Sequence, residues 1–277
     1  MRTVLITGTS SGIGLEAAAL LAARGWRVFA GMRDPEKCGA LDAALAKASA
    51  PSRVEVVHLD LTDPASIEKA ASSVLAATGG VLDAVVHNAG VSAAGAVEDV
   101  PMHEIRRVME VNFIGPLKLT RLLLPSLRAH GNGRIVLVSS EAAFLGQPAN
   151  SIYCASKWAL EGFAESIAFE LAPFNVDIVI VEPGPYRTEI WRSTPRYMPE
   201  GSPYRDFART VFRSADAHAA RQARDPKEVA QAIALALSVR RPRFRYSVGP
   251  FAKLGHVLRG KIPSRLMRRG VSRYLGI

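Results

Sequence analysis

A glycine-rich segment directly after the first apolar run constrains the fold of this chain most. The run Thr3–Thr7 has the β-branched composition of a strand. Three glycines follow it at once in the pattern G-x-x-x-G-x-G: Gly8, Gly12 and Gly14. An Ala- and Leu-rich helical pattern continues over Ile13–Arg24. Because glycines permit a tight turn and helix N-termini bind anions, the segment predicts a phosphate-binding turn between a strand and a helix.

The chain up to about residue 185 alternates short β-branched runs with longer helical patterns. The further strand-like runs are Arg27–Ala30, Val54–His58, Ala84–His87, Arg134–Val138 and Val176–Val181. The further helical patterns are Glu36–Ala48, Pro64–Ala77, Met102–Ala129 and Asn150–Leu171. This alternation indicates βαβ units, and continuous apolar strands are typical of a parallel sheet covered on both faces. We therefore predict an α/β fold with a doubly wound parallel sheet (Rossmann) as a single domain over residues 1–250.

The pattern changes after Pro183. Residues 185–225 are rich in Arg, Pro, Ser and Tyr and only weakly periodic. Asp225 is a good N-cap for a helix over Pro226–Leu237. A short strand over Phe244–Val248 is expected to extend the sheet.

The positive charge is concentrated at the C-terminus. The net charge is +10, yet 11 basic residues and no acidic ones lie between Arg240 and Ile277. An apolar stripe at helical spacing accompanies them: Leu254, Leu258, Ile262, Leu266, Met267, Val271 and Leu275. Residues 251–277 thus form a predicted basic amphipathic extension. It either contacts an anionic membrane peripherally or packs its apolar face on the domain or a second subunit. Nucleic acid is not an expected partner, because aromatic residues are not interleaved as stacking platforms.

Composition excludes several classes of protein. The chain is 48% apolar and has no apolar run of the roughly 18 residues that a membrane span needs. The two cysteines, Cys38 and Cys154, support neither a disulfide framework nor a metal cluster, and they fit a cytoplasmic location.

Short motifs follow the glycine-rich turn in a fixed order. They are Asp60-Leu61, Asn88-Ala89-Gly90, Asn112, Ser140, Tyr153 with Lys157, and Pro183-Gly184 with Thr188. Together with T-G-x-x-x-G-I-G they resemble the short-chain dehydrogenase/reductase family, closely over residues 1–190 and loosely to about 250. Residues 153–166 are particularly similar to the branch that holds 17β-hydroxysteroid and retinol dehydrogenases.

Tyr153 and Lys157 are four residues apart on a predicted helix and so share one face. We expect the lysine charge to favour the tyrosine phenolate and to make Tyr153 a general acid/base. The family resemblance implies that Lys157 binds the nicotinamide ribose and that Ser140 hydrogen-bonds the substrate oxygen. It further implies that Asn112 holds a water in a proton relay to Lys157.

The resemblance also implies a dinucleotide site at the carboxyl ends of the strands. Its expected residues are Gly8, Ser10, Ser11, Gly12, Ile13, Gly14, Arg33, Asp60, Leu61, Asn88, Ala89, Gly90, Tyr153, Lys157, Pro183, Gly184, Tyr186 and Thr188. At the second strand's end, Met32-Arg33 replaces the acid usual in NAD-selective members. A guanidinium pairs well with a 2′-phosphate, so NADP(H) is the predicted cofactor. The alternative is that Arg33 is a solvated charge paired with Asp34.

The substrate is expected to be a hydrophobic alcohol or carbonyl of steroid, retinoid or lipid-like character, because the similar branch handles such molecules. In a fold of this family, residues 185–225 are the expected helical substrate lid. The predicted substrate contacts are Ser140, Tyr153, Tyr186 and Trp191. The alternatives are a 3-oxoacyl-carrier-protein-type reductase and a non-catalytic NADP-binding regulator. By family analogy, we expect a homodimer or homotetramer through the helices Met102–Ala129 and Asn150–Leu171.

Overall fold

A seven-stranded parallel sheet forms the centre of the molecule. The structure, a computed structural model, describes residues 1–48, 53–249 and 263–276. The strands are β1 (Thr3–Thr7), β2 (Arg27–Met32), β3 (Val54–His58), β4 (Ala84–His87), β5 (Arg134–Val138), β6 (Asp177–Pro183) and β7 (Arg245–Val248). Their order is β3-β2-β1-β4-β5-β6-β7, and every neighbouring pair is parallel. The order reverses beside β1, and ligands bind at such a switch point in doubly wound sheets.

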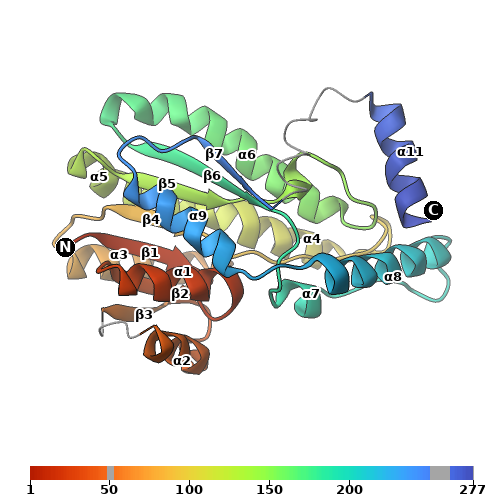
Figure 1. The fold of residues 1–277 in the computed structure, drawn as a ribbon, viewed down its shortest axis with the longest axis horizontal. Helices are drawn as coiled ribbons and strands as arrows, with labels where there is room; N and C mark the ends of the chain where they lie inside the picture. The colour runs from red at the N-terminus through yellow and green to blue at the C-terminus, as the bar shows by residue number, and fades with distance from the viewer. Residues whose placement is uncertain (49–52, 250–262, 277) are drawn as a thin grey trace.

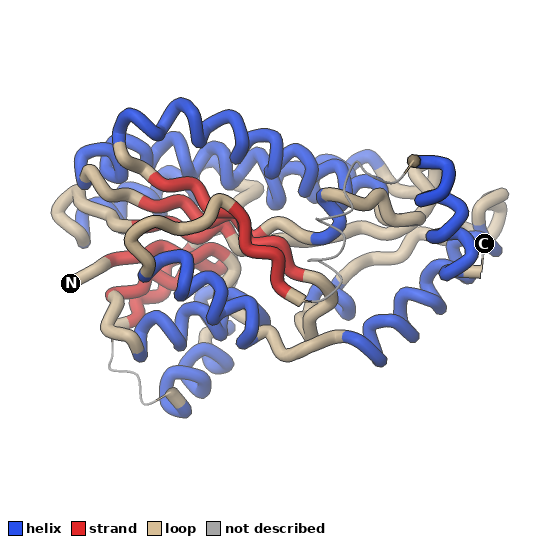
Figure 2. The backbone as a smooth tube through the Cα atoms, turned by 45° about the horizontal axis from the view of Figure 1, so that its top comes forward, coloured by secondary structure: helices blue, strands red, loops and turns tan. Residues whose placement is uncertain are grey.

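Helices cover both faces of this sheet, as Figures 1 and 2 show. One face packs against α1 (Gly12–Ala23), α2 (Gly39–Lys47) and α9 (Lys227–Ser238) through one apolar core. The other packs against α3 (Pro64–Ala77), α5 (Gly115–His130) and α6 (Ser151–Leu171) through a second core. The predicted doubly wound α/β fold is confirmed.

The predicted helix over Met102–Ala129 is wrong in one respect. The chain instead forms α4 (Met102–Met109), a π-helical turn η2 (Glu110–Ile114) and then α5. A π turn adds a residue to the helical repeat and re-aims the side chains that it carries. Helical periodicity does not reveal such a turn, because apolar residues continue on both sides of it. The other predicted bounds agree with the structure within three residues. The remaining short turns are η1 (Pro35–Lys37), η3 (Glu141–Ala143) and η4 (Ala172–Phe174).

The predicted lid segment, residues 185–225, contains two helices, α7 (Ile190–Ser193) and α8 (Arg205–Gln222). In Figure 1 they lie beyond the carboxyl ends of the strands, and the C-terminal helix α11 (Ser264–Leu275) lies beside α8. The Ser214 hydroxyl of α8 donates to the Leu275 carbonyl at 3.1 Å. Of the predicted apolar stripe, Leu254, Leu258 and Ile262 lie outside the described residues. Within the described ranges, no helix is long and apolar enough to cross a bilayer.

Candidate active site

A cavity of about 1220 Å³ opens at the carboxyl ends of the strands and continues beneath the lid. Its walls come from the glycine-rich turn, from the loops after β2 to β6, from α7 and α8, and from α11. The predicted cofactor residues line it with the exception of Gly14, and the predicted catalytic residues Ser140, Tyr153 and Lys157 line it as well. Asn112 lies directly behind the wall. The structure therefore gathers motifs that are spread over almost 190 residues of sequence.

The glycine-rich turn is packed too closely to admit side chains. A Cβ on Gly14 would lie 2.2 Å from the Gly8 carbonyl oxygen, and one on Gly8 would lie 2.7 Å from the Ala89 Cα. Gly12 has a φ of +56°, and its missing side chain leaves room for Thr188 at the opposite wall. These contacts make a bare backbone cradle at the start of α1, as a pyrophosphate requires.

Asn88 ties this cradle to the sheet. Its side-chain amide donates to the carbonyls of Thr7 and Gly8, at 3.0 Å each. The Thr7 hydroxyl accepts from the backbone N–H groups of Asn88 and Ala89, also at 3.0 Å. The turn after β4 is thus fixed against the turn after β1, which keeps both walls of the cradle in register.

The loops after β2 and β3 form the far end of the cavity. Arg33 is exposed there, and Asp34 pairs with Lys37, Nζ to Oδ2 at 2.5 Å. Within the described residues no ion pair joins Arg33 to Asp34, but the pKa of Asp34 is lowered by Lys37 and, to a smaller extent, by the Arg33 charge, so a solvated Arg33 beside Asp34 stays the alternative. The Asp60 carboxylate accepts from the Thr62 N–H at 2.8 Å, which shapes the loop after β3.

Tyr153 and Lys157 project from the first turns of α6 toward the end of β5. The Lys157 ammonium lies 5.7 Å from the centroid of the Tyr153 ring and donates to the Val138 carbonyl at 2.9 Å. Ser140 lies two residues after the end of β5 and caps η3, its hydroxyl accepting from the Ala142 N–H at 3.2 Å. The predicted constellation of Ser140, Tyr153 and Lys157 is therefore assembled at one place.

Burial dominates the electrostatics of this group. It raises the pKa of Tyr153 to about 12, and the hydrogen bond from Ser140 offsets only part of that rise. The expectation that Lys157 lowers the pKa of Tyr153 is therefore wrong for this structure: the pKa rises, because burying a phenolate costs more than the Ser140 hydrogen bond returns. Burial also lowers the pKa of Lys157 to about 8, while the nearby Glu161 carboxylate raises it. At neutral pH the pair is a neutral phenol beside an ammonium.

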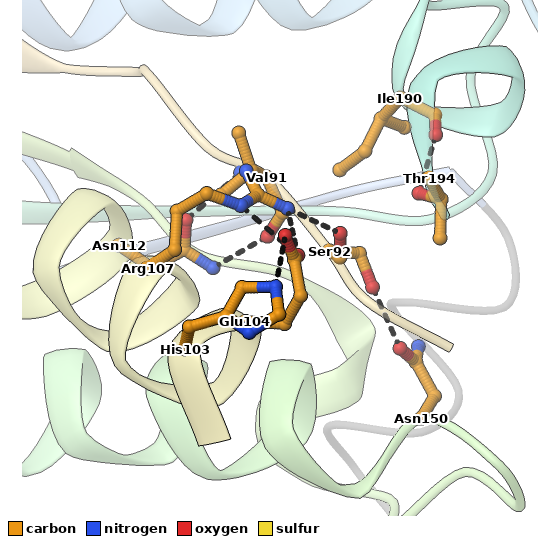
Figure 3. Close-up of polar contacts among 9 residues, drawn as sticks. All are labelled: Val91, Ser92, His103, Glu104, Arg107, Asn112, Asn150, Ile190 and Thr194. Carbon is orange, nitrogen blue, oxygen red and sulfur yellow. Dashed lines mark hydrogen bonds and ion pairs between the residues drawn. The ribbon is translucent and has the colours of Figure 1, made fainter. Parts of the chain in front are cut away.

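Asn112 stands at the middle of the π turn and is 1% exposed. Its carbonyl oxygen accepts from the Val91 N–H at 2.9 Å, and its amide donates to the Val91 carbonyl at 2.8 Å and to the Ser156 hydroxyl at 2.9 Å. Figure 3 shows the bonds between Asn112 and Val91, which hold the loop after β4 against the helix. Its expected role in a water relay stays a prediction.

A second set of polar contacts extends this wall toward the lid, also drawn in Figure 3. The Arg107 guanidinium donates to the Glu104 carboxylate at 2.7 Å and to the Ser92 carbonyl at 3.2 Å. The Ser92 hydroxyl donates to the Asn150 side chain, just before α6, at 2.9 Å. The wall between the cofactor end and the lid end of the cavity is therefore braced by hydrogen bonds.

The two predicted substrate residues of the lid differ in their placement. Tyr186 is 3% exposed, packs in the core shared with α9, and donates its hydroxyl to Glu228 at 3.1 Å. Trp191 lines the cavity, is 37% exposed, and donates to the Tyr186 carbonyl at 2.8 Å. The structure thus favours Trp191 as an apolar surface for a ligand, whereas a substrate contact of Tyr186 stays a prediction.

Two features of the cavity escape a reading of the sequence. Glu141, next to Ser140, lines the cavity, and burial raises the pKa of its carboxyl to about 7. The apolar residues of α11 also line the cavity, and they are Leu266, Met267, Val271 and Leu275. For the apolar lining from α11, the only signal in the sequence is the apolar stripe of the tail, and the stripe does not indicate which surface it covers.

Some residues near the site are structural. His87 is 2% exposed, contacts the Thr120 hydroxyl at 2.9 Å, and has a pKa that burial lowers to about 3. Cys154 is buried, and its sulfur accepts from the Gln147 N–H at 3.3 Å. Both residues therefore belong to the packing.

The cradle and the cavity fit a dinucleotide. The glycine backbone offers N–H groups to a pyrophosphate, the loops after β2 and β3 flank an adenosine end, and Tyr153 and Lys157 flank a nicotinamide end.

Comparisons with known proteins agree with this architecture. The profile of the short chain dehydrogenase family matches residues 2–198. Human 17-beta-hydroxysteroid dehydrogenase type 1 is 35% identical over 259 residues, which are 88% of this chain and 76% of that protein. Human retinol dehydrogenase 8 is 35% identical over 263 residues, which are 88% of this chain and 80% of that protein.

Solved structures give the same result. A short-chain dehydrogenase from Streptomyces avermitilis superposes with a TM-score of 0.80 at 35% identity, covering 98% of this chain and 97% of the other. A metagenomic short-chain oxidoreductase in complex with NADP superposes with a TM-score of 0.71 at 28% identity, covering 90% and 97%.

Proposed function

Because the chain belongs to the short-chain dehydrogenase/reductase family, we propose that it is an NADP(H)-dependent oxidoreductase that interconverts a hydrophobic alcohol and its carbonyl. The observation that carries the proposal is the assembly of Ser140, Tyr153 and Lys157 in one cavity with the glycine cradle. A nucleotide-binding regulator needs the cradle but not the buried tyrosine and lysine beside it. The similarity to hydroxysteroid and retinol dehydrogenases supports the reaction class.

In the direction of reduction, the substrate carbonyl carbon gains a hydride and its oxygen gains a proton. A bound nicotinamide cofactor supplies the hydride. The Ser140 hydroxyl donates a hydrogen bond to the carbonyl oxygen, and the Tyr153 hydroxyl donates the proton as the alkoxide develops. The raised pKa of Tyr153 keeps the phenol protonated at neutral pH, which suits an acid.

Lys157 stabilises the product of that proton transfer. Its ammonium lies 5.7 Å from the Tyr153 ring centroid. Because the pKa of Lys157 is about 8, the side chain stays charged at any pH below that value. In the buried site this charge favours the phenolate that proton donation leaves behind. Oxidation of an alcohol follows the same path in reverse, and the phenolate then acts as the base.

The choice of NADP(H) rests on Arg33. Its exposed guanidinium lines the adenosine end of the cavity, while Asp34 is paired with Lys37 instead. An unpaired guanidinium favours a 2′-phosphate, which carries two negative charges more than a hydroxyl.

The hydrophobic substrate class is supported by the lid end of the cavity. Phe144, Trp191 and Phe212 line it together with the apolar face of α11. Two other aromatic residues of the segment 185–225 pack elsewhere: Phe207 lies in an apolar cluster with α8, and Tyr197 packs against the cluster around Val108 of α4. Apolar walls with few polar groups near the reacting atoms are typical of sites for water-poor ligands.

Purified protein tests the proposal through NADPH oxidation with a panel of carbonyls. The panel runs from steroid and retinoid carbonyls to a short 3-oxoacyl thioester. Turnover confined to the bulky compounds is the expected result. Turnover confined to the thioester would contradict the substrate class and favour acyl-chain reduction, and NADPH binding without any turnover would favour a regulator.

We also propose that the chain forms a homodimer or homotetramer through α5 and α6. These helices expose large apolar side chains on their outer surfaces, which are Leu122, Trp158 and Phe169. Phe169, at 83% exposed, is the most exposed of them. Light scattering on the wild type and on Phe169→Glu tests this: an assembly that the variant weakens is expected, and a wild-type monomer would refute it.

A further inference from the structure

The helix α11 has two faces of opposite chemistry. Met267, Val271 and Leu275 are spaced four apart, are partly buried, and line the cavity. The opposite face carries four exposed arginines, which are Arg265, Arg268, Arg269 and Arg273. At 100° per residue these arginines fall within one arc that is centred away from the apolar stripe. The apolar stripe therefore packs inside the molecule, and the arginine face is the side of α11 that is accessible to a partner.

The charge on this face is uncompensated. No ion pair of these arginines occurs within the described part of the chain, and no acidic residue lies anywhere between Arg240 and Ile277. Four like charges along three helical turns repel one another and so favour an anionic partner. Leu266 stands at the edge of the arginine face and is 56% exposed. A basic face edged by an exposed leucine suits an interface between water and lipid headgroups.

The position of α11 links this face to the cavity. One side of the helix is a wall of the lid end, and the other side is the outer surface of the molecule (Figure 1). We propose that the arginine face of α11 docks peripherally on an anionic lipid bilayer and brings the mouth of the cavity to that bilayer, from which the hydrophobic substrate enters. The second half of this inference rests on the proposed function, because only an apolar substrate resides in the bilayer.

Vesicle co-sedimentation of the full-length protein tests the docking. Phosphatidylcholine vesicles with and without phosphatidylglycerol serve as the probe, at low and at high salt. We expect the protein to pellet with the anionic vesicles alone and to dissociate at high salt, because the attraction is electrostatic and screened. The double variant Arg268→Glu/Arg269→Glu should lower the partition coefficient at least about tenfold, since each arginine contributes substantially near an anionic surface.

The matched control is Arg24→Glu/Lys69→Glu, which reverses two exposed charges on α1's end and on α3, away from α11. This control should bind vesicles nearly as the wild type does. Both variants should reduce a bulky carbonyl that is supplied in buffer without vesicles at the wild-type rate, because the arginines of α11 do not line the cavity. Only the α11 variant should lose the rate with a carbonyl that is dissolved in anionic vesicles.

Three results would overturn the inference. They are a wild type that does not pellet with anionic vesicles, an α11 variant that binds as well as the control, and retention by an acidic carrier protein but not by vesicles. The last would make the face a protein-docking surface. If the wild type pellets but reduces no carbonyl, the docking stands and the proposed function fails.

Discussion

At the scale of the residue, the charge of Lys157 depends on a buried network that joins α6 to β6 and β7. Glu161 lies one turn after Lys157 and is 2% exposed. Arg245 of β7 donates to Glu161 at 2.8 Å, to Glu165 at 2.6 Å and to Glu182 at 3.1 Å. This arginine compensates the buried carboxylates without cancelling the field that Glu161 exerts on Lys157.

Replacing Glu161 should therefore change the pH dependence of the reaction. The Glu161 carboxylate raises the pKa of Lys157, so Glu161→Gln lowers that pKa from about 8 and the ammonium is lost at a lower pH. We expect the alkaline limb of kcat against pH to move to lower pH. The matched control is Glu165→Gln, which also removes a partner of Arg245 but is half-exposed. An unchanged alkaline limb in a folded Glu161 variant would show that the network is only structural.

Arg33 carries the proposed selection of the cofactor. Removing a charge-assisted pair with the 2′-phosphate costs about 1.5–3 kcal/mol, which is roughly tenfold to a hundredfold in binding. Arg33→Ala should raise the KM for NADPH by that factor and leave the KM for NADH nearly unchanged. Steady-state kinetics with both cofactors measure the ratio. An equal effect on both would place the selectivity elsewhere.

At the scale of the element, the turn between β1 and α1 tolerates least change. A Cβ at position 14 meets the Gly8 carbonyl oxygen at 2.2 Å, and backbone atoms cannot move aside as a flexible side chain can. Gly14→Ala should thus open the cradle and abolish nucleotide binding. Fluorescence titration with NADPH measures that loss, and Gly39→Ala is the control because its Cβ would meet nothing within 4 Å. Tight NADPH binding by the Gly14 variant would contradict the role of the cradle.

The sequence predicts regular elements well and their interruptions poorly. The predicted strand Arg134–Val138 has the same bounds in the structure, because buried parallel strands are continuous apolar runs. The π turn at Glu110–Ile114 was missed, because the contacts of Asn112 with Val91 and Ser156 stabilise it and all three are distant in sequence. The local hydrophobic pattern of a sequence does not indicate a turn that is stabilised by tertiary hydrogen bonds.

At the scale of the whole molecule, the sequence predicts the cofactor and catalytic part of the candidate site, because these residues belong to short motifs at the ends of strands. Parallel strands bring those ends to one edge, so Gly12, Asn88 and Ser140 converge once the strand order is set. The sequence does not predict in the same way which residues line the lid end of the cavity. The apolar stripe of α11 fits equally a membrane, a subunit or the cavity, and only the packed chain shows that it lines the cavity.

The central claim is that Tyr153 donates the proton in an NADPH-linked carbonyl reduction. Tyr153→Phe removes one hydroxyl and leaves the ring that packs beside Lys157. NADPH oxidation with a bulky carbonyl, measured beside NADPH binding, tests the claim most directly. We expect kcat to fall by about 10²- to 10⁴-fold while NADPH binding stays nearly intact. A variant that turns over at the wild-type rate would contradict the assignment.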